Sequence, residues 1–98
     1  MIAEIHVAPS PIGTPLDKYK HINEVIETIS SSGLQYEVSA LGTTFEGSDS
    51  KVWEVLRKVH EGTIRAGATS NISNIRIFSS VDEAVSIDSL TKKFRDKN

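Results

Sequence analysis

Glu46, Thr43 and Thr44 stand together in the short stretch GTTFEG, residues 42–47, and raise a chemical question. The stretch alternates like a strand, yet four of its six positions go to two glycines, a polar threonine and a carboxylate. Such a strand has little to pack, but its glycines let another group approach the backbone closely. The stretch lacks the lysine and the glycine pattern of a phosphate loop, so it is not a nucleotide-binding motif.

Other residues that could do chemistry show no catalytic or metal-binding spacing. His6, His21 and His60 are far apart in the sequence, and we expect no metal site. The sequence has no Gly-x-Ser-x-Gly nucleophile elbow, which disfavours acyl-transfer catalysis. His6 beside Glu4 or Glu46 could still do acid–base work, so an enzyme stays an alternative.

The composition indicates one globular domain, residues 1–98. Hydrophobic residues make up 38% and charged residues 24%, and the chain has no cysteine for disulfides or thiolate metal sites. The net charge is -2 and the basic residues form no stripe, so we expect no nucleic-acid partner. A leader-like N-terminus and a run of about 18 apolar residues are both missing, which favours a cytoplasmic protein without a membrane partner.

Hydrophobic periodicity and turn residues divide the chain into seven predicted elements. Thr14 with Pro15 and Asp17 reads as the start of the first helix, and Gly33 as its end. Ser48, Asp49 and Ser50 can each cap the second helix, which Gly67 closes. The predicted elements are a strand at 2–8 ended by Pro9 and Pro11, a helix at about 15–30, strands at about 36–40 and 43–46, a helix at about 50–66, a strand at 70–79 and a helix at 86–96.

This order of elements predicts an α+β fold, the ferredoxin-like βαββαβ sandwich, with a four-stranded antiparallel sheet and an extra C-terminal helix. The first strand would lie between the third and the fourth, with two helices on one face. The side chains expected to face the helices are Ala3, Ile5, Val7, Tyr36, Val38, Ala40, Thr43, Phe45, Ser73, Ile75 and Ile77.

The other face of this sheet would carry a dense polar patch. Its members are Glu4, His6, Glu37, Ser39, Thr44, Glu46, Asn74 and Arg76. A solvated sheet face, a ligand site and a surface for a second protomer all remain open for this patch. Trp53 could form the wall of an aromatic pocket or the edge of the core. Thr14 lies in a loop whose backbone donors precede a helix, where a polar group could dock.

Several short motifs in this order resemble one known family. They are PIGT at residues 11–14, SGLQY at 32–36, LGTTFEG at 41–47, and a helix that runs from His60-Glu61 to Gly67-Ala68. Together they resemble the small thiamine-binding protein family, also described as DUF77 or UPF0045, over about residues 2–78. One turn departs from the family's pattern, because residues 79–83 are acidic where the family tends to carry a basic, Arg/Asp-containing turn.

The resemblance implies a homo-oligomer, built as a dimer of dimers, that binds thiamine (vitamin B1) or its hydroxymethylpyrimidine portion without catalysis and without a cofactor. An aminopyrimidine needs a carboxylate, hydroxyl or backbone partner and apolar walls. Glu46, Thr43 and Thr44 are the expected centre of the site, and Ser39, His6, Trp53 and Thr14 are further candidates. The competing reading is an oligomeric interaction or regulatory module that binds no small molecule.

Overall fold

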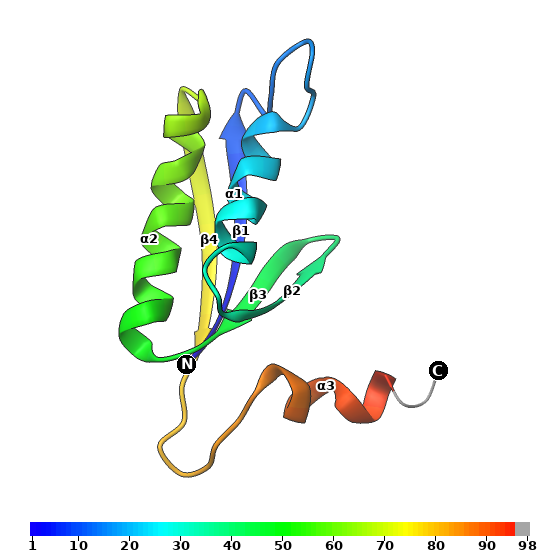
Figure 1. Ribbon diagram of the computed structural model, residues 1–98, viewed down its shortest axis with the longest axis vertical. Coiled ribbons are helices and arrows are strands. Elements are labelled where there is room, and N and C mark those ends of the chain that lie inside the picture. The colour runs from blue at the N-terminus through cyan, green and yellow to red at the C-terminus, as the bar shows by residue number, and fades with distance from the viewer. Residues whose placement is uncertain (96–98) are drawn as a thin grey trace.

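The computed structural model describes residues 1–95 and has the predicted order of elements (Figure 1). The elements are β1 (Ile2–Ser10), α1 (Lys20–Ser30), β2 (Gln35–Ser39), β3 (Gly42–Glu46), α2 (Asp49–Ala66), β4 (Ser70–Phe78) and α3 (Ile87–Arg95). The four strands form an antiparallel sheet in the order β2-β3-β1-β4. Both the ferredoxin-like α+β fold and the position of the first strand are therefore confirmed.

Helix α2 begins and ends where its capping residues predict. The hydroxyl oxygen of Ser48, the N-cap residue, accepts a hydrogen bond from the backbone N–H of Lys51 at 3.4 Å. Gly67 closes the helix with φ of 131°, a backbone conformation that residues with a Cβ rarely adopt. A Cβ at this position would also lie 2.9 Å from Nε2 of the buried His21.

Helix α1 begins later than the sequence predicts, at Lys20 and not directly after Thr14. The capping residues close a separate turn instead: Thr14 Oγ1 accepts a hydrogen bond from the Asp17 N–H at 3.0 Å, and the Thr14 N–H donates to the Asp17 carbonyl at 2.8 Å. Gly13 packs under this turn, where a Cβ would lie 2.3 Å from the Asp17 carbonyl oxygen. The predicted contact between Thr14 and Asp17 is therefore present, but it closes a turn in a loop and does not start the helix.

Strand β1 also differs from the prediction, because it continues through Pro9 to Ser10. The Ser10 carbonyl faces β4, since it accepts a hydrogen bond from the Thr69 N–H at 2.8 Å. Pro9 therefore faces the opposite side, along which β3 pairs only as far as Ile5. The missing N–H of Pro9 costs no ladder bond there.

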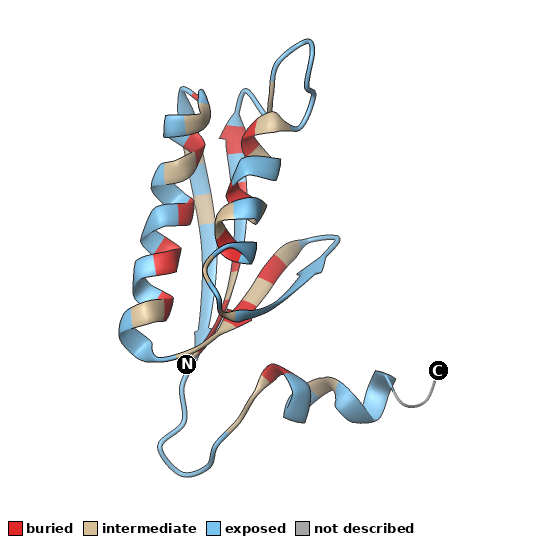
Figure 2. Cartoon of the chain, viewed as in Figure 1, coloured by how far each residue is buried: buried red, intermediate tan, exposed pale blue. Residues whose placement is uncertain are grey.

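The hydrophobic core lies between the two long helices and the centre of the sheet (Figure 2). Its buried members are Ala3, Ile5, Val7, Val25, Ile29, Phe45, Val52, Val55, Leu56 and Val59. The prediction that the whole helix-facing set is buried is wrong for both edge strands. Tyr36, Val38 and Ala40 at one edge and Ile75 and Ile77 at the other are exposed. Register places Tyr36 opposite Phe45 and Ile77 opposite Ala3, so these side chains face the helix side but extend beyond what two helices cover.

Helix α3 lies apart from the α1/α2 layer and below the hairpin formed by β2 and β3 in Figure 1. The link before it is turned by Ser80, whose hydroxyl oxygen accepts hydrogen bonds from the N–H groups of Asp82 and Glu83. The predicted last residue of this helix, 96, lies outside the described residues. Within residues 1–95, no helix is both long and apolar enough to cross a membrane.

Candidate functional site

The two glycines of the GTTFEG stretch make room for neighbouring groups. A Cβ on Gly42 would lie 3.2 Å from the Ile5 carbonyl oxygen and 3.4 Å from Cγ of Glu4. A Cβ on Gly47 would lie 2.8 Å from Cδ2 of Leu34. The distance at Gly47 is too short for a side chain, so this glycine leaves room for Leu34. At Gly42 the close neighbour is the Ile5 carbonyl oxygen of the adjacent strand, whereas 3.4 Å to Glu4 is an ordinary contact.

The residues between these glycines divide between the two faces of the sheet. Thr43 pairs in register with the helix-facing Ile5, and it is 5% exposed. Thr44 and Glu46 point to the opposite, open face, where Thr44 lies beside Glu4. The three residues expected at the centre of one site therefore do not converge on a single point.

A cleft opens at the tip of the β2–β3 hairpin. Pairing between β1 and β3 ends at Ile5 and Thr43, and beyond this pair the hairpin diverges from β1 (Figure 1). The resulting hairpin cleft has a volume of about 200 Å³. Its walls are aliphatic side chains of β1, α1 and β2, together with polar residues at the hairpin end: Ile5, His6, Val7, Ile22, Val25, Ile26, Ile29, Val38, Ser39, Ala40, Leu41, Gly42 and Thr43.

Thr43 is one of the polar residues that line this mostly aliphatic cleft. The residue is almost completely buried, and its side chain makes no hydrogen bond among residues 1–95. The hydroxyl of Ser39, at the rim, is already engaged as a donor to the Gly42 carbonyl at 2.9 Å. His6 is exposed and contributes to the cleft from β1. Three predicted site residues thus share the hairpin cleft, and of these only the Ser39 side chain makes a hydrogen bond among residues 1–95.

The open face of the sheet has a second, shallower hollow of about 330 Å³. It contains Thr44 and an ion pair between Glu4 Oε1 and Arg76 Nη1 at 3.9 Å. Ile2 and Phe78 form its apolar sides. The sequence reasoning placed Glu4 and Arg76 on this face but missed Phe78, which the alternation along the fourth strand could have added.

Glu46 is engaged by the C-terminal helix. Its Oε2 accepts a hydrogen bond from the backbone N–H of Ile87 at 3.0 Å. The C-terminal helix also contacts the neighbouring strand β2, because Arg95 Nη1 donates a hydrogen bond to Glu37 Oε1 at 2.8 Å. These two carboxylates of the predicted polar patch therefore hold α3 in the folded chain.

Two further candidates lie outside both hollows. Trp53 is 54% exposed near the start of α2. Thr14 belongs to the turn that precedes α1, and its hydroxyl is bonded to the Asp17 N–H. Neither residue lines the hairpin cleft or the open-face hollow.

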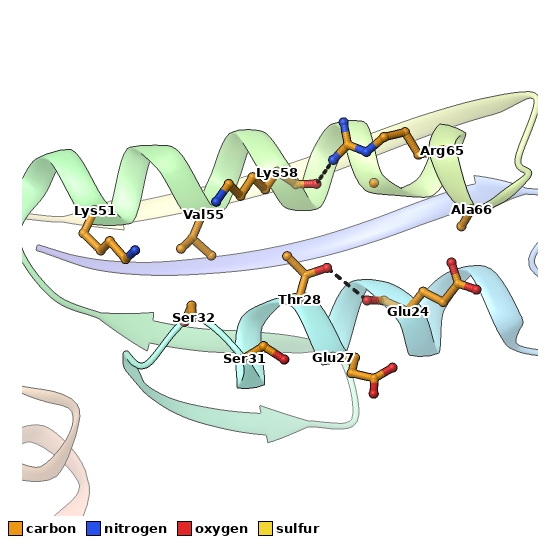
Figure 3. Close-up of a pocket in the computed structure, with 11 residues that line it drawn as sticks. Glu24, Glu27, Thr28, Ser31, Ser32, Lys51, Val55, Lys58, Arg65 and Ala66 are labelled. Carbon is orange, nitrogen blue, oxygen red and sulfur yellow. Dashed lines mark hydrogen bonds between the residues drawn. The ribbon is translucent and has the colours of Figure 1, made fainter.

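A groove of about 610 Å³, larger than the two hollows above, lies between α1 and α2 (Figure 3). Its cations are matched by carboxylates of α2: Lys58 and Lys51 lie 2.9 and 3.8 Å from Glu54, and Arg65 lies 3.3 Å from Glu61. The bond to Lys58 lowers the pKa of Glu54, and bonds to Arg57 and Arg65 lower the pKa of Glu61. Because these charges are already paired within one helix, the groove offers few free groups to a ligand.

The histidines occupy three separate environments. His6 is exposed, and the buried His21 donates from Nδ1 to the Pro11 carbonyl at 2.7 Å. His60 Nδ1 lies 2.6 Å from Ser73 Oγ. In the described part of the chain, no three residues with His, Cys, Asp or Glu side chains come together as metal ligands.

The family assignment follows from a match over nearly the whole chain. The model of the family described as thiamine-binding protein matches residues 3–95. The chain belongs to this family. The resemblance of the short motifs is thereby confirmed.

Individual relatives of this thiamine-binding family member support the same assignment. The chain is 37% identical to a UPF0045 protein of Clostridium perfringens (strain 13 / Type A) over 59 residues, which are 60% of this chain and 62% of that protein. The aligned part therefore spans less than two thirds of that relative. A solved domain of unknown function, DUF77, from Bacillus cereus superimposes with a TM-score of 0.81 at 29% identity, covering 99% of this chain and 93% of that one.

A second solved structure supports the fold alone. It comes from Thermotoga maritima, and its description assigns it provisionally to thiamine biosynthesis or salvage. It superimposes with a TM-score of 0.81 at 23% identity and covers 96% of this chain and 97% of its own.

Proposed function

We propose that this protein binds the hydroxymethylpyrimidine portion of thiamine, free or within thiamine, in the hairpin cleft, and that it catalyses no reaction. The membership in the thiamine-binding family supports the class of ligand. The observation that carries the location is Thr43, a buried residue whose side chain makes no hydrogen bond among residues 1–95, in the lining of a mostly aliphatic cleft of about 200 Å³.

The chemistry of the cleft fits a flat, uncharged heterocycle. Aliphatic side chains such as Ile22 and Ile26 offer apolar walls on which a ring can pack, and hydroxyls fix its orientation. The Thr43 hydroxyl can donate to a ring nitrogen or accept from the exocyclic amine. Among residues 1–95 no carboxylate lines the cleft, so the cationic thiazolium ring of thiamine would extend towards the solvent-exposed opening near His6.

The exposed edge of β4 supports the proposal that the protein is a homo-oligomer. Strand β4 is hydrogen-bonded only to β1, and it spans nine residues without a proline. Ile72 on this strand is 68% exposed, and Phe78 is 47% exposed. A long apolar edge of this kind pairs readily with another chain, so we propose that a second copy covers it. A dimer of dimers would need a further surface, for which the open face around Ile2 and Phe78 is the candidate.

The proposed site is tested by Thr43→Val, which removes the hydroxyl and keeps the shape of the side chain. We expect the Kd for hydroxymethylpyrimidine, measured by isothermal titration, to rise about tenfold, because losing a hydrogen bond to a ligand costs about 1.5 kcal/mol. Thr44→Val makes the same change on the open face of the same strand. A larger effect of Thr44→Val than of Thr43→Val would place the ligand on the open face and contradict the proposal.

The competing function is an interaction module that uses its apolar β4 edge and binds no small molecule. Ile72→Lys separates the two accounts, because a charged residue on an edge strand opposes pairing with another chain. Light scattering of this variant should report a smaller assembly, whereas the residues that line the hairpin cleft of each subunit are unchanged. Loss of assembly without any ligand binding by the natural chain would favour the interaction module.

A further inference from the structure

Helix α3 is attached to the body of the protein through the β2–β3 hairpin. At its start, Ile87 is 4% exposed and its N–H donates to Glu46 at the end of β3. At its end, Arg95 pairs with Glu37 in the middle of β2. Its first turn is otherwise capped internally, because Ser86 and Ser89 exchange hydrogen bonds between backbone N–H and side-chain hydroxyl at 2.9 Å. Glu46 therefore accepts a hydrogen bond from a first-turn N–H that the helix itself leaves without a partner.

The two strands of the hairpin differ in how firmly they are held. Strand β3 pairs with β1 from Ile2 to Ile5, and its Phe45 is completely buried. Strand β2 pairs with β3 alone, and all five of its residues are exposed. The wall of the hairpin cleft includes Val38 and Ser39 of this exposed strand. One side of the proposed ligand site is thus its least supported part.

We propose that α3 is a brace that holds β2 in the position required for ligand binding, with Glu46, Glu37 and Arg95 as positioning residues. This inference rests on the proposed function of the hairpin cleft. Glu46 anchors the start of α3 on the firmly held β3, and Arg95 at the far end of the helix fixes Glu37 of β2. Glu46 then supports the site through α3 and does not contact the ligand.

The brace couples the ligand to the C-terminal helix in both directions. If a docked α3 raises the affinity of the cleft, then a bound ligand must stabilise the docked helix by the same factor. Amide hydrogen exchange of α3 should therefore slow when hydroxymethylpyrimidine is added, although no residue of α3 lines the cleft.

Two matched pairs of variants test the brace. Ile87→Pro removes the N–H that Glu46 accepts while leaving Glu46 intact, and proline is tolerated at the first position of a helix. Ile87→Ala is its control, because it also shortens the side chain but keeps the N–H. Arg95→Gln removes the contact to Glu37 together with the bonds that Arg95 makes to Asp88 and Thr91 within α3, and Lys92→Gln removes the same charge from the same last turn of the helix.

We expect Ile87→Pro to weaken hydroxymethylpyrimidine binding about threefold to tenfold relative to Ile87→Ala, as the loss of a charge-assisted hydrogen bond implies. Arg95→Gln should weaken it by about twofold relative to Lys92→Gln, since an exposed ion pair contributes less. Hydrogen exchange of residues 35–39 should be faster in both test variants than in their controls.

The outcomes separate failure of the brace from failure of the proposed function. If Thr43→Val weakens binding but each test variant matches its control, the brace is wrong and the ligand site stands. If Glu46→Gln weakens binding while Ile87→Pro matches Ile87→Ala, Glu46 contacts the ligand directly and the brace is also wrong. If the natural chain binds no hydroxymethylpyrimidine, the proposed function fails. Exchange of residues 35–39 without ligand then decides the brace: unchanged rates overturn it, and faster rates in the test variants support its structural part.

Discussion

Strands β1 and β2 belong to the same sheet but have opposite roles in it. Strand β1 has a strand on each side, and Ala3, Ile5 and Val7 are buried beneath the two long helices. Strand β2 lies at the edge and has no buried residue. The difference shows that the stability of the fold is concentrated in β1, α1, α2 and β3, the inner strand of the hairpin. Strand β2, the outer strand, forms part of the cleft wall but adds little to the stability.

We expect the largest difference between the two regions when the same substitution, Leu to Ala, is made in each of them. Leu56→Ala deletes a side chain that is 2% exposed in α2, and we expect it to lower the free energy of unfolding by about 2–5 kcal/mol. Leu41→Ala makes the same change at the hairpin tip, where the side chain is 83% exposed, and should change it by less than about 0.5 kcal/mol. Urea denaturation measures both. Equal losses would mean that the hairpin tip is covered in solution, by the oligomer for example.

Hydrogen exchange of the two strands gives a second, intermediate test. Amides of β1 that bond to β4 should exchange only on global unfolding, because their ladder is central and their side chains are buried. Amides of β2 should exchange at least roughly a hundredfold faster, since this strand opens locally from a single neighbour. Mass spectrometry of peptides covering residues 2–10 and 35–39 reports both. Comparable protection would contradict the view that β2 is weakly held.

The smallest expected effect lies on the solvent face of α2. Cationic neighbours lower the pKa of Glu54 and Glu61 below the ordinary value of 4.5. A carboxylate whose pKa is lower in the folded chain stabilises it above the unfolded pKa, and this contribution is lost as the pH falls through the folded pKa. Glu61→Gln should therefore lower Tm slightly at pH 7, and the difference from the natural chain should shrink at pH 3. A difference that grows on acidification would mean that the sign is wrong.

The fold was predictable from the sequence because its signals are local. The alternation of Ala3, Ile5 and Val7 and the caps at Ser48 and Gly67 lie within single elements, and the structure uses each as expected. The start of α1 was not predictable in this way. Thr14 and Asp17 satisfy each other in a closed turn, and nothing in their spacing separates that turn from a helix start.

The candidate site was only partly predictable, because it depends on distances between elements. Thr43, Ser39 and His6, which the sequence suggested as site residues, line one cleft, and their role in binding stays a prediction. The position of that cleft follows from the point where β3 leaves β1, which no local pattern encodes. The partner of Glu46 lies 41 residues further along the chain, so its engagement by α3 could not be read from the GTTFEG stretch.

The most direct test of the account is isothermal titration of the natural chain with hydroxymethylpyrimidine and, separately, with thiamine, on protein whose mass has been checked by light scattering. The account predicts saturable binding of both at a fixed ratio to the subunits of an oligomer, with the Thr43→Val variant weakened for both ligands to a similar extent. No heat and no thermal stabilisation at millimolar concentrations of either compound would contradict it, and the chain would then share the fold of its family without this ligand.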